Sequence, residues 1–291
     1  MKLSAFAKIN WSLDITGVRE DGYHLMDMVM QPVSISDEIT LAPSGGLSIS
    51  ASGFPRVRAD GSNLAYRAAL ALKNAAGYAG GASIHVQKAI PVGAGMGGGS
   101  ADAAAVLFGL NRLWGLNLSG SELEEIGLTL GADVPFCLRG GLARTRGIGE
   151  ILDNYPDDHH FWLLVTQPCR GLSTGDVFRA YHESRNVVHP DTEKVLQALC
   201  AGDLALLSSS AGNVLEAVSA AIRPKISAAA EEMRRSGAVF ASMTGSGSAV
   251  FGVYRNRSAA EKARTDLSRS SGKVFLAHTQ SDSIRILEEE T

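Results

Sequence analysis

Paired cysteines, an excess of charge of one sign and long apolar runs are all missing from this chain of 291 residues. Lys and Arg number 27 against 30 Asp and Glu. A sequence-blind nucleic-acid binder normally carries a basic excess, so we expect no nucleic-acid partner. No segment approaches the roughly 20 apolar residues of a membrane span. Residues 1–10 hold too short an apolar stretch for a signal peptide. We therefore expect a cytoplasmic protein with no membrane partner.

The three cysteines, Cys137, Cys169 and Cys200, are far apart and odd in number. Their spacing fits neither a disulfide framework nor a paired metal site. We expect reduced, buried thiols, as in cytoplasmic proteins. Hydrophobic residues make up 45% of the chain and charged residues 20%, which is typical of a globular protein.

Glycine, in contrast, is abundant and is concentrated in a few loops. The run at 91–102 reads Pro-Val-Gly-Ala-Gly-Met-Gly-Gly-Gly-Ser-Ala-Asp, between a predicted strand at 83–87 and a predicted helix at 101–114. Glycines let backbone N–H groups approach a ligand closely, and a helix N-terminus favours an anion, most often phosphate. Ser100 is placed to cap the helix or to face a phosphate or its metal. Asp102 would repel phosphate unless a cation lies between them.

Other glycine-loop families fit this segment less well. Gly93, Gly95 and Gly98 match the dinucleotide fingerprint, but the acidic residue expected about 20 positions later, at the end of a second strand, is missing. The Lys-Ser/Thr ending of a P-loop is also absent. The further signature segments of protein kinases are not found either.

The order of predicted elements indicates an α+β protein with two domains, 1–155 and 156–291, separated at a polar stretch containing Pro156. In the second half we expect a strand at 161–165 and a long helical stretch at 214–235. Strands at 238–242, 249–254 and 273–278, with a helix before the last, suggest a split β-α-β arrangement.

Several segments together resemble the GHMP kinases. The run 91–104 is similar to their central motif, with Met96 in place of a leucine and extra glycines. Residues 7–10, Ala-Lys-Ile-Asn, resemble the first motif, and 243–251 resemble the third. Residues 22–24, 131–136 and 147–150 also match the branch of the family that acts on a cytidine diphosphate ester of methylerythritol. The likeness covers nearly the whole chain in the expected order; at Val214 the chain departs from it, since the family often has Asp there.

The resemblance implies a GHMP kinase fold, with an N-terminal ATP-binding domain and a C-terminal ferredoxin-like substrate domain. It implies transfer of the γ-phosphoryl group of ATP, with Mg²⁺, to a hydroxyl of a small-molecule substrate. Such transfers depend on positioning, charge neutralisation and a group that takes the hydroxyl proton.

For catalysis, the resemblance implies Asp133 as the base and Lys8 as its cationic partner. On spacing alone Asp133 is an ordinary turn aspartate. A cation beside it would keep it ionised and neutralise charge on the moving phosphoryl group. Asn10 points to the same side of its strand as Lys8 and could orient a substrate hydroxyl or phosphate.

The resemblance also implies two sets of binding residues, and it assigns no metal ligands. A flat base suits an aromatic face, and a histidine can present one donor and one acceptor to its edge. The substrate set is Asn10, Tyr23, His24, Thr174 and Phe178. The nucleotide set is Asn63, Lys88, Pro91, Gly93, Gly95, Gly97, Gly98, Gly99 and Ser100.

Three other functions remain as alternatives. One is another GHMP kinase, of the homoserine or mevalonate type, which residues 22–24 and the three consecutive glycines disfavour. A second is an NAD-dependent oxidoreductase, which lacks the acidic residue noted above. The third is a nucleotide-sensing protein on the same fold, which would bind ATP without turnover.

Overall fold

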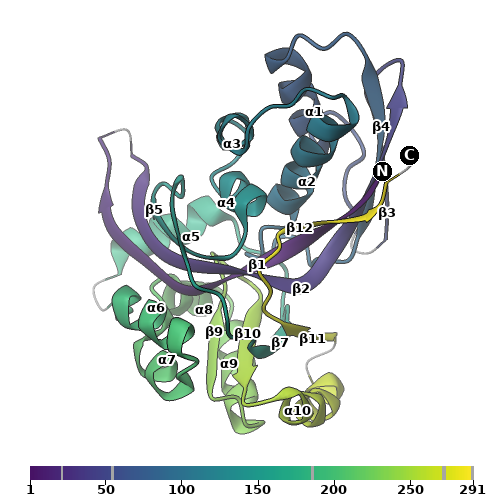
Figure 1. Ribbon diagram of the computed structural model, residues 1–291. Coiled ribbons are helices and arrows are strands. Elements are labelled where there is room, and N and C mark those ends of the chain that lie inside the picture. Colours follow the sequence, from purple (N-terminus) through teal and green to yellow (C-terminus); the bar gives the residue numbers. More distant parts are fainter. Residues whose placement is uncertain (21, 54–55, 185–186, 271–272, 290–291) are drawn as a thin grey trace.

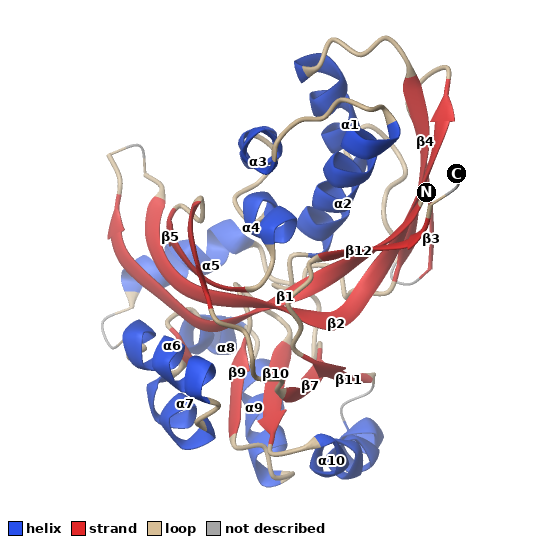
Figure 2. Cartoon of the chain, viewed as in Figure 1, coloured by secondary structure: helices blue, strands red, loops and turns tan. Residues whose placement is uncertain are grey.

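The computed structural model describes residues 1–20, 22–53, 56–184, 187–270 and 273–289. Two β-sheets lie one beyond the other, each with its own helices (Figures 1 and 2). The N-terminus and the last strand lie side by side, because Lys2 pairs with Glu288.

Within the described residues, the first sheet has eight strands and is built on a long antiparallel pair, β1 and β2. Residues on both faces of β1 are buried, because helices cover one face and the second half of the chain covers the other (Figure 1). The strands are β1 (Lys2–Val18), β2 (His24–Ser44), β3 (Ser48–Gly53), β4 (Gly81–Lys88), β5 (Leu142–Gly147), β6 (Ile151–Tyr155), β8 (Gly212–Asn213) and β12 (Ile284–Glu288).

Four helices pack on one side of this sheet: α1 (Leu64–Ala75), α2 (Gly98–Leu113), α3 (Gly120–Leu128) and α4 (Val134–Arg139). The central one, α2, contacts both β1 and β2. Its buried side chains include Ala101, Ala103, Ala104 and Ala105. These small side chains let the helix, and the glycine-rich loop before it, lie close to the sheet.

The second sheet is antiparallel, in the order β11-β7-β10-β9. With its helices it forms a β-α-β-β-α-β unit, which confirms the expected ferredoxin-like arrangement. Its members are β7 (Trp162–Thr166), α9 (Lys225–Arg235), β9 (Phe240–Met243), β10 (Val250–Tyr254), α10 (Arg257–Ser270) and β11 (Val274–His278). Between β7 and α9 lie α5 (Thr174–Glu183), α6 (Thr192–Ala201), α7 (Leu204–Ser210), β8 and α8 (Glu216–Ile222).

Two sequence-based predictions of helix limits are wrong. The single helix expected at 214–235 is two helices, α8 and α9, because Pro224 is the N-cap residue of the second and interrupts the first. Ser100 does not cap α2. The helix begins at Gly98, and Gly97 occupies the cap position with a left-handed φ of 69°, which glycine adopts readily.

Aromatic packing joins the two halves of the molecule. Trp11 of β1 packs edge-on against Phe161 and Phe251, with ring centroids 5.4 Å and 5.7 Å away. Its indole N–H donates to Gln31 Oε1 at 2.9 Å. A division at 155/156 remains a proposal, and β12 and β8 from beyond it pair with β1.

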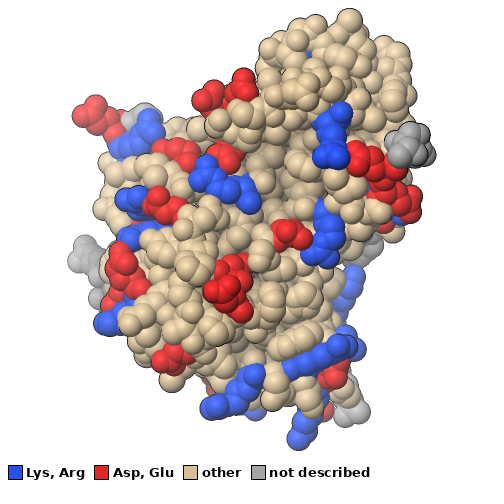
Figure 3. All heavy atoms as spheres, viewed as in Figure 1, with Lys and Arg blue, Asp and Glu red and all other residues tan. Residues whose placement is uncertain are grey.

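The surface carries charges of both signs. On the face drawn in Figure 3, Lys and Arg side chains are interspersed with Asp and Glu. All three cysteines are free. Cys137 is buried, as expected, whereas Cys169 and Cys200 are only partly buried. Among the described residues, we find no helix with the length and apolar character that crossing a bilayer requires.

Candidate active site

The glycine-rich loop separates two cavities and lines both of them. The larger, of about 830 Å³, lies toward the second half of the chain. The smaller, of about 400 Å³, lies between the loop and the start of α1. Gly93, Gly95, Gly97 and Ser100 belong to both linings. A group bound at one side of the loop therefore lies next to a group bound at the other.

The residues predicted from the sequence divide between these cavities. The nine nucleotide-binding candidates all line the smaller cavity: Asn63, Lys88, Pro91, Gly93, Gly95, Gly97, Gly98, Gly99 and Ser100. The catalytic and substrate-binding candidates all line the larger one: Lys8, Asn10, Tyr23, His24, Asp133, Thr174 and Phe178. The fold thus brings each set together from distant parts of the chain.

Asn63 and Lys88 hold the smaller cavity in shape. Asn63 is the N-cap of α1, where its Oδ1 accepts from Ala65 N at 2.9 Å. Lys88 is only 5% exposed. Its ammonium group bonds to Asp37 and, at 2.8 Å, to Asp102 Oδ2.

Asp102 therefore has the neighbouring cation that a carboxylate near phosphate requires. Burial, opposed by Lys88 and reinforced by Asp37, raises the pKa of Asp102 well above its usual range. Burial also disfavours the charge of Lys88, but attraction to Asp102 and Asp37 outweighs this and raises its pKa. Lys88, in contact with both carboxyl groups, offsets their negative charge beside the smaller cavity.

Asp37 also fixes the backbone that leads into the glycine-rich loop. Its Oδ1 accepts hydrogen bonds from the backbone N–H groups of Ala89 and Ile90, at 2.6 Å and 2.9 Å. At Gly95, with φ of 77°, a Cβ would lie only 2.1 Å from the Thr244 carbonyl oxygen. Glycine at this position lets the loop touch the segment that resembles the third family motif.

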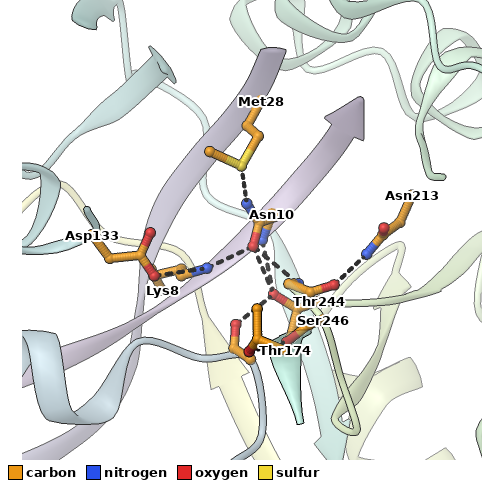
Figure 4. Close-up of polar contacts among 10 residues, drawn as sticks. Lys8, Asn10, Met28, Asp133, Thr174, Asn213, Thr244 and Ser246 are labelled. Carbon is orange, nitrogen blue, oxygen red and sulfur yellow. Dashed lines mark hydrogen bonds and ion pairs between the residues drawn. The ribbon is translucent and has the colours of Figure 1, made fainter. Parts of the chain in front are cut away.

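Lys8 and Asp133 point toward one another (Figure 4), and both line the larger cavity. Their charged atoms, Nζ and Oδ2, are 3.6 Å apart. Lys8 is 4% exposed, whereas the Asp133 side chain is 33% exposed and therefore accessible to a ligand. The carboxylate is held at the start of α4, a short helix that the sequence reading missed.

Asn10 holds this pair in place. Its Oδ1 accepts from Lys8 Nζ at 2.7 Å and from Gly245 N at 3.1 Å. Its backbone N–H donates to Thr244 Oγ1 at 3.0 Å. Asn10 therefore connects Lys8 to a second loop, residues 244–249, which precedes β10, as Figure 4 shows.

That loop is fixed from a second side. Asn213 donates to the carbonyl oxygens of Met243 and Gly245, at 2.9 Å and 2.8 Å. Thr174, at the start of α5, lies 3.1 Å from Ser246 through their hydroxyl groups. Next to Asn213, Val214 is 4% exposed, so an apolar side chain suits this departure from the family pattern.

The aromatic candidates lie at the far end of the larger cavity. The rings of His24 and Phe178 are in direct contact, with centroids 4.4 Å apart. Tyr23 is 61% exposed and offers a face for stacking. In this arrangement a base would stack on Tyr23 or displace Phe178. Burial, and then the neighbouring His182, lower the pKa of His24, so the neutral ring is favoured.

The sequence reading missed three residues of this site. Asp37 and Asn213 stand outside the glycine motif and act through contacts with distant segments. His182 also lines the larger cavity. Only its spacing of four residues after Phe178, which corresponds to one helical turn, could have indicated it.

Chemically, this is an arrangement for transfer between two ligands. An anion cradle faces one cavity, and an accessible carboxylate paired with a buried cation faces the other. The carboxylate can take a proton from a hydroxyl group, while the cation and the loop N–H groups stabilise charge on a moving phosphoryl group.

Comparison with known proteins gives consistent matches. Residues 63–141 match the profile of the GHMP kinases N terminal domain, and residues 195–273 match that of the GHMP kinases C terminal. The 4-diphosphocytidyl-2-C-methyl-D-erythritol kinase of Bacillus pumilus (strain SAFR-032) is 42% identical over 270 residues, which are 92% of this chain and 93% of that protein.

Solved structures agree with these matches. A crystal structure of 4-(cytidine 5'-diphospho)-2C-methyl-D-erythritol kinase has a TM-score of 0.84 at 34% identity, covering 97% of this chain and 100% of that one. Homoserine kinase from Cytophaga hutchinsonii has a TM-score of 0.77 at 18% identity, covering 98% and 96%. At that identity the second match shows the fold alone.

Proposed function

The chain belongs to the GHMP kinase family, and we propose that it transfers the γ-phosphoryl group of ATP to the 2-hydroxyl of 4-diphosphocytidyl-2-C-methyl-D-erythritol. The reaction gives the 2-phosphate, in the non-mevalonate route to isoprenoid precursors. Two relatives that are 42% and 41% identical to this chain, and a solved structure at 34% identity, carry the name of this kinase. The observation that carries the proposal is the glycine-rich loop as a shared wall between two cavities.

In the proposed reaction the two ligands occupy opposite sides of this wall. ATP lies in the smaller cavity with its phosphates on the loop, and the cytidine ester lies in the larger one. The γ-phosphate then reaches the acceptor hydroxyl past Gly97 and Ser100, which line both sides. Holding two reactants in this way supplies much of the rate enhancement in phosphoryl transfer.

Asp133 takes the proton of the 2-hydroxyl as the hydroxyl oxygen attacks the γ-phosphorus of ATP. The bond from this phosphorus to the bridging oxygen of the β-phosphate breaks, and ADP leaves. Lys8, whose Nζ lies 3.6 Å from Asp133 Oδ2, stabilises the negative charge of the transferring group. Asn10 acts by holding the Lys8 ammonium through its 2.7 Å hydrogen bond.

Mg²⁺ fits the oxygen groups at this wall. It usually binds through one or two protein oxygens together with substrate phosphates and water. The hydroxyl group of Ser100, which lines both cavities, would hold it together with the phosphates of ATP. Bound there, the ion would neutralise phosphate charge. Chelation should abolish turnover, and added Mg²⁺ should restore it.

A coupled assay of ATP consumption tests the proposal. The cytidine diphosphate ester should support turnover, with homoserine and mevalonate as the matched alternative acceptors. Preferred turnover of either alternative would overturn the acceptor assignment. ATP binding in calorimetry without turnover of any acceptor would instead support the nucleotide-sensing function.

A further inference from the structure

A second histidine, His182, lies in direct contact with His24 at the end of the larger cavity. Nε2 of His182 lies 2.7 Å from Nε2 of His24, and the two ring centroids are 4.6 Å apart. His24 begins β2 in the first half of the chain, and His182 lies in the last turn of α5 in the second. Both side chains line the cavity.

The helix α5 presents two side chains to His24 from the same face. Phe178 and His182 are one helical turn apart, so they lie on one face of α5. Phe178 contacts the His24 ring, and His182 bonds to its nitrogen. The His24 ring is thus held both by packing against the Phe178 ring and by a hydrogen bond with His182.

The short distance between the two nitrogens constrains their protons. A neutral imidazole has one N–H donor and one acceptor nitrogen, so one ring of the pair must donate and the other accept. Within the described residues, the side-chain hydrogen bond of His24 uses Nε2, which leaves Nδ1 for a ligand. The state of Nε2 decides whether Nδ1 donates or accepts.

We propose that His182 is a positioning residue of the pyrimidine site, which orients the His24 ring and fixes the tautomer that His24 presents to the base. This inference rests on the proposed function, since it takes the ligand to be a cytidine diphosphate ester. Burial and the neighbouring His182 lower the pKa of His24, which favours the neutral ring that such recognition requires.

The test compares two substitutions of His182. His182→Phe keeps a flat ring and removes the hydrogen bond. His182→Gln keeps a polar nitrogen near the same place. We expect His182→Phe to raise the KM for the cytidine ester by roughly two- to tenfold, the net value of one hydrogen bond. The KM for ATP and kcat should change little, and His182→Gln should restore most of the affinity.

Combining the change with His24→Ala shows whether His182 acts through His24. In that background, His182→Phe should cause no further rise in the KM for the cytidine ester. An additional rise of similar size would mean that His182 touches the base itself, which overturns a positioning role. An unchanged KM for His182→Phe in the otherwise intact protein would also overturn it.

A measurement without substrate separates this inference from the proposed function. Long-range ¹H–¹⁵N NMR spectra of ¹⁵N-histidine-labelled, ligand-free protein report the tautomer of each ring. We expect one fixed tautomer for His24 in the unsubstituted protein and a mixture of both in His182→Phe. Identical His24 signals in the two proteins would overturn the inference. Failure of the unsubstituted protein to use the cytidine ester would instead overturn the proposed function.

Discussion

At the scale of single residues, the contrast between Lys8 and Asp133 explains what each can do. Lys8 is 4% exposed and bonded to Asn10, so its position is set by the protein. Asp133 remains one-third exposed at its side chain, so a hydroxyl group can reach it. An accessible carboxylate can take a proton from a hydroxyl group, and a fixed cation beside it can stabilise charge on a phosphoryl group.

Asp133→Asn removes the proposed base and changes little volume. We expect turnover to fall by about 10²–10⁴-fold, the usual contribution of general-base catalysis. ATP affinity, measured by calorimetry, should stay near that of the unsubstituted protein, because Asp133 lines only the larger cavity. Turnover at the original rate would exclude Asp133 as the base.

Tyr23→Ala tests whether a base stacks at the exposed end of the larger cavity. Stacking on an aromatic ring contributes roughly 1–3 kcal/mol per base, so the KM for the cytidine ester should rise about tenfold or more. Tyr23→Phe is the matched control, since it keeps the ring face and should retain most of the affinity. The KM for ATP should not change. An equal loss toward both substrates, with a lower melting temperature, would indicate a structural role.

Most candidate residues could be predicted because they lie in contiguous motifs. The glycine run and residues 7–10 carry both spacing and residue type, so their places in the two cavities followed from the resemblance. Asp37 and His182 could not be predicted in this way. Each is a single residue, and its role depends on a partner 51 or more residues away.

At the scale of elements, α2 directly follows the glycine-rich loop, and a glycine lies at each end of this helix. Gly97 and Gly115 have left-handed φ values of 69° and 63°. A Cβ at Gly97 would lie 3.1 Å from Lys8 Cγ, whereas a Cβ at Gly115 would meet no atom within 4 Å. Any other residue would therefore strain the backbone at both positions, but only at Gly97 would its side chain crowd a neighbouring residue.

Gly97→Ala and Gly115→Ala separate these two effects. Each should lower the free energy of unfolding by about 1–2 kcal/mol, the cost of a left-handed non-glycine residue. Only Gly97→Ala should also weaken ATP binding and slow turnover, because its methyl group crowds the loop and Lys8. Denaturant unfolding with calorimetry checks both. Equal ATP affinity in the two variants would mean that the loop does not need this close approach.

Helix limits were harder to predict than the helices themselves. Glycine has a poor helix propensity, so the sequence favoured a start of α2 after Ser100, but Gly97 at the cap position allows the helix to begin earlier. The short helices α4 and α7 span six and seven residues, too few to show a helical period. The strand β12 gains its stability by pairing with β1, which no local pattern reveals.

At the scale of the whole molecule, the site is assembled from both ends of the chain. β1 carries Lys8 and Asn10, and the loop before β10 supplies Thr244 and Gly245 to hold Asn10. The larger cavity also takes residues from both halves. The proposed division at 155/156 therefore separates two units that complete one another.

The contacts between the two halves predict how a fragment that ends at residue 155 behaves. A fragment of residues 1–155 would expose the edge of β1 that pairs with β12. It would also expose Trp11, which packs on Phe161 and Phe251 from the other half. An uncovered sheet edge and an exposed aromatic core favour aggregation. We expect this fragment to show no cooperative thermal transition by circular dichroism, whereas the full chain unfolds in one.

Co-expression of residues 1–155 with residues 156–291 is the control. The second fragment returns β12, Phe161 and Phe251, so the pair should form a folded complex that regains the thermal transition and ATP-dependent turnover. A sharp melting transition of the first fragment alone would show that its sheet is stable without these contacts. The two halves would then be independent domains, and the cavity between them would depend on docking rather than on shared folding.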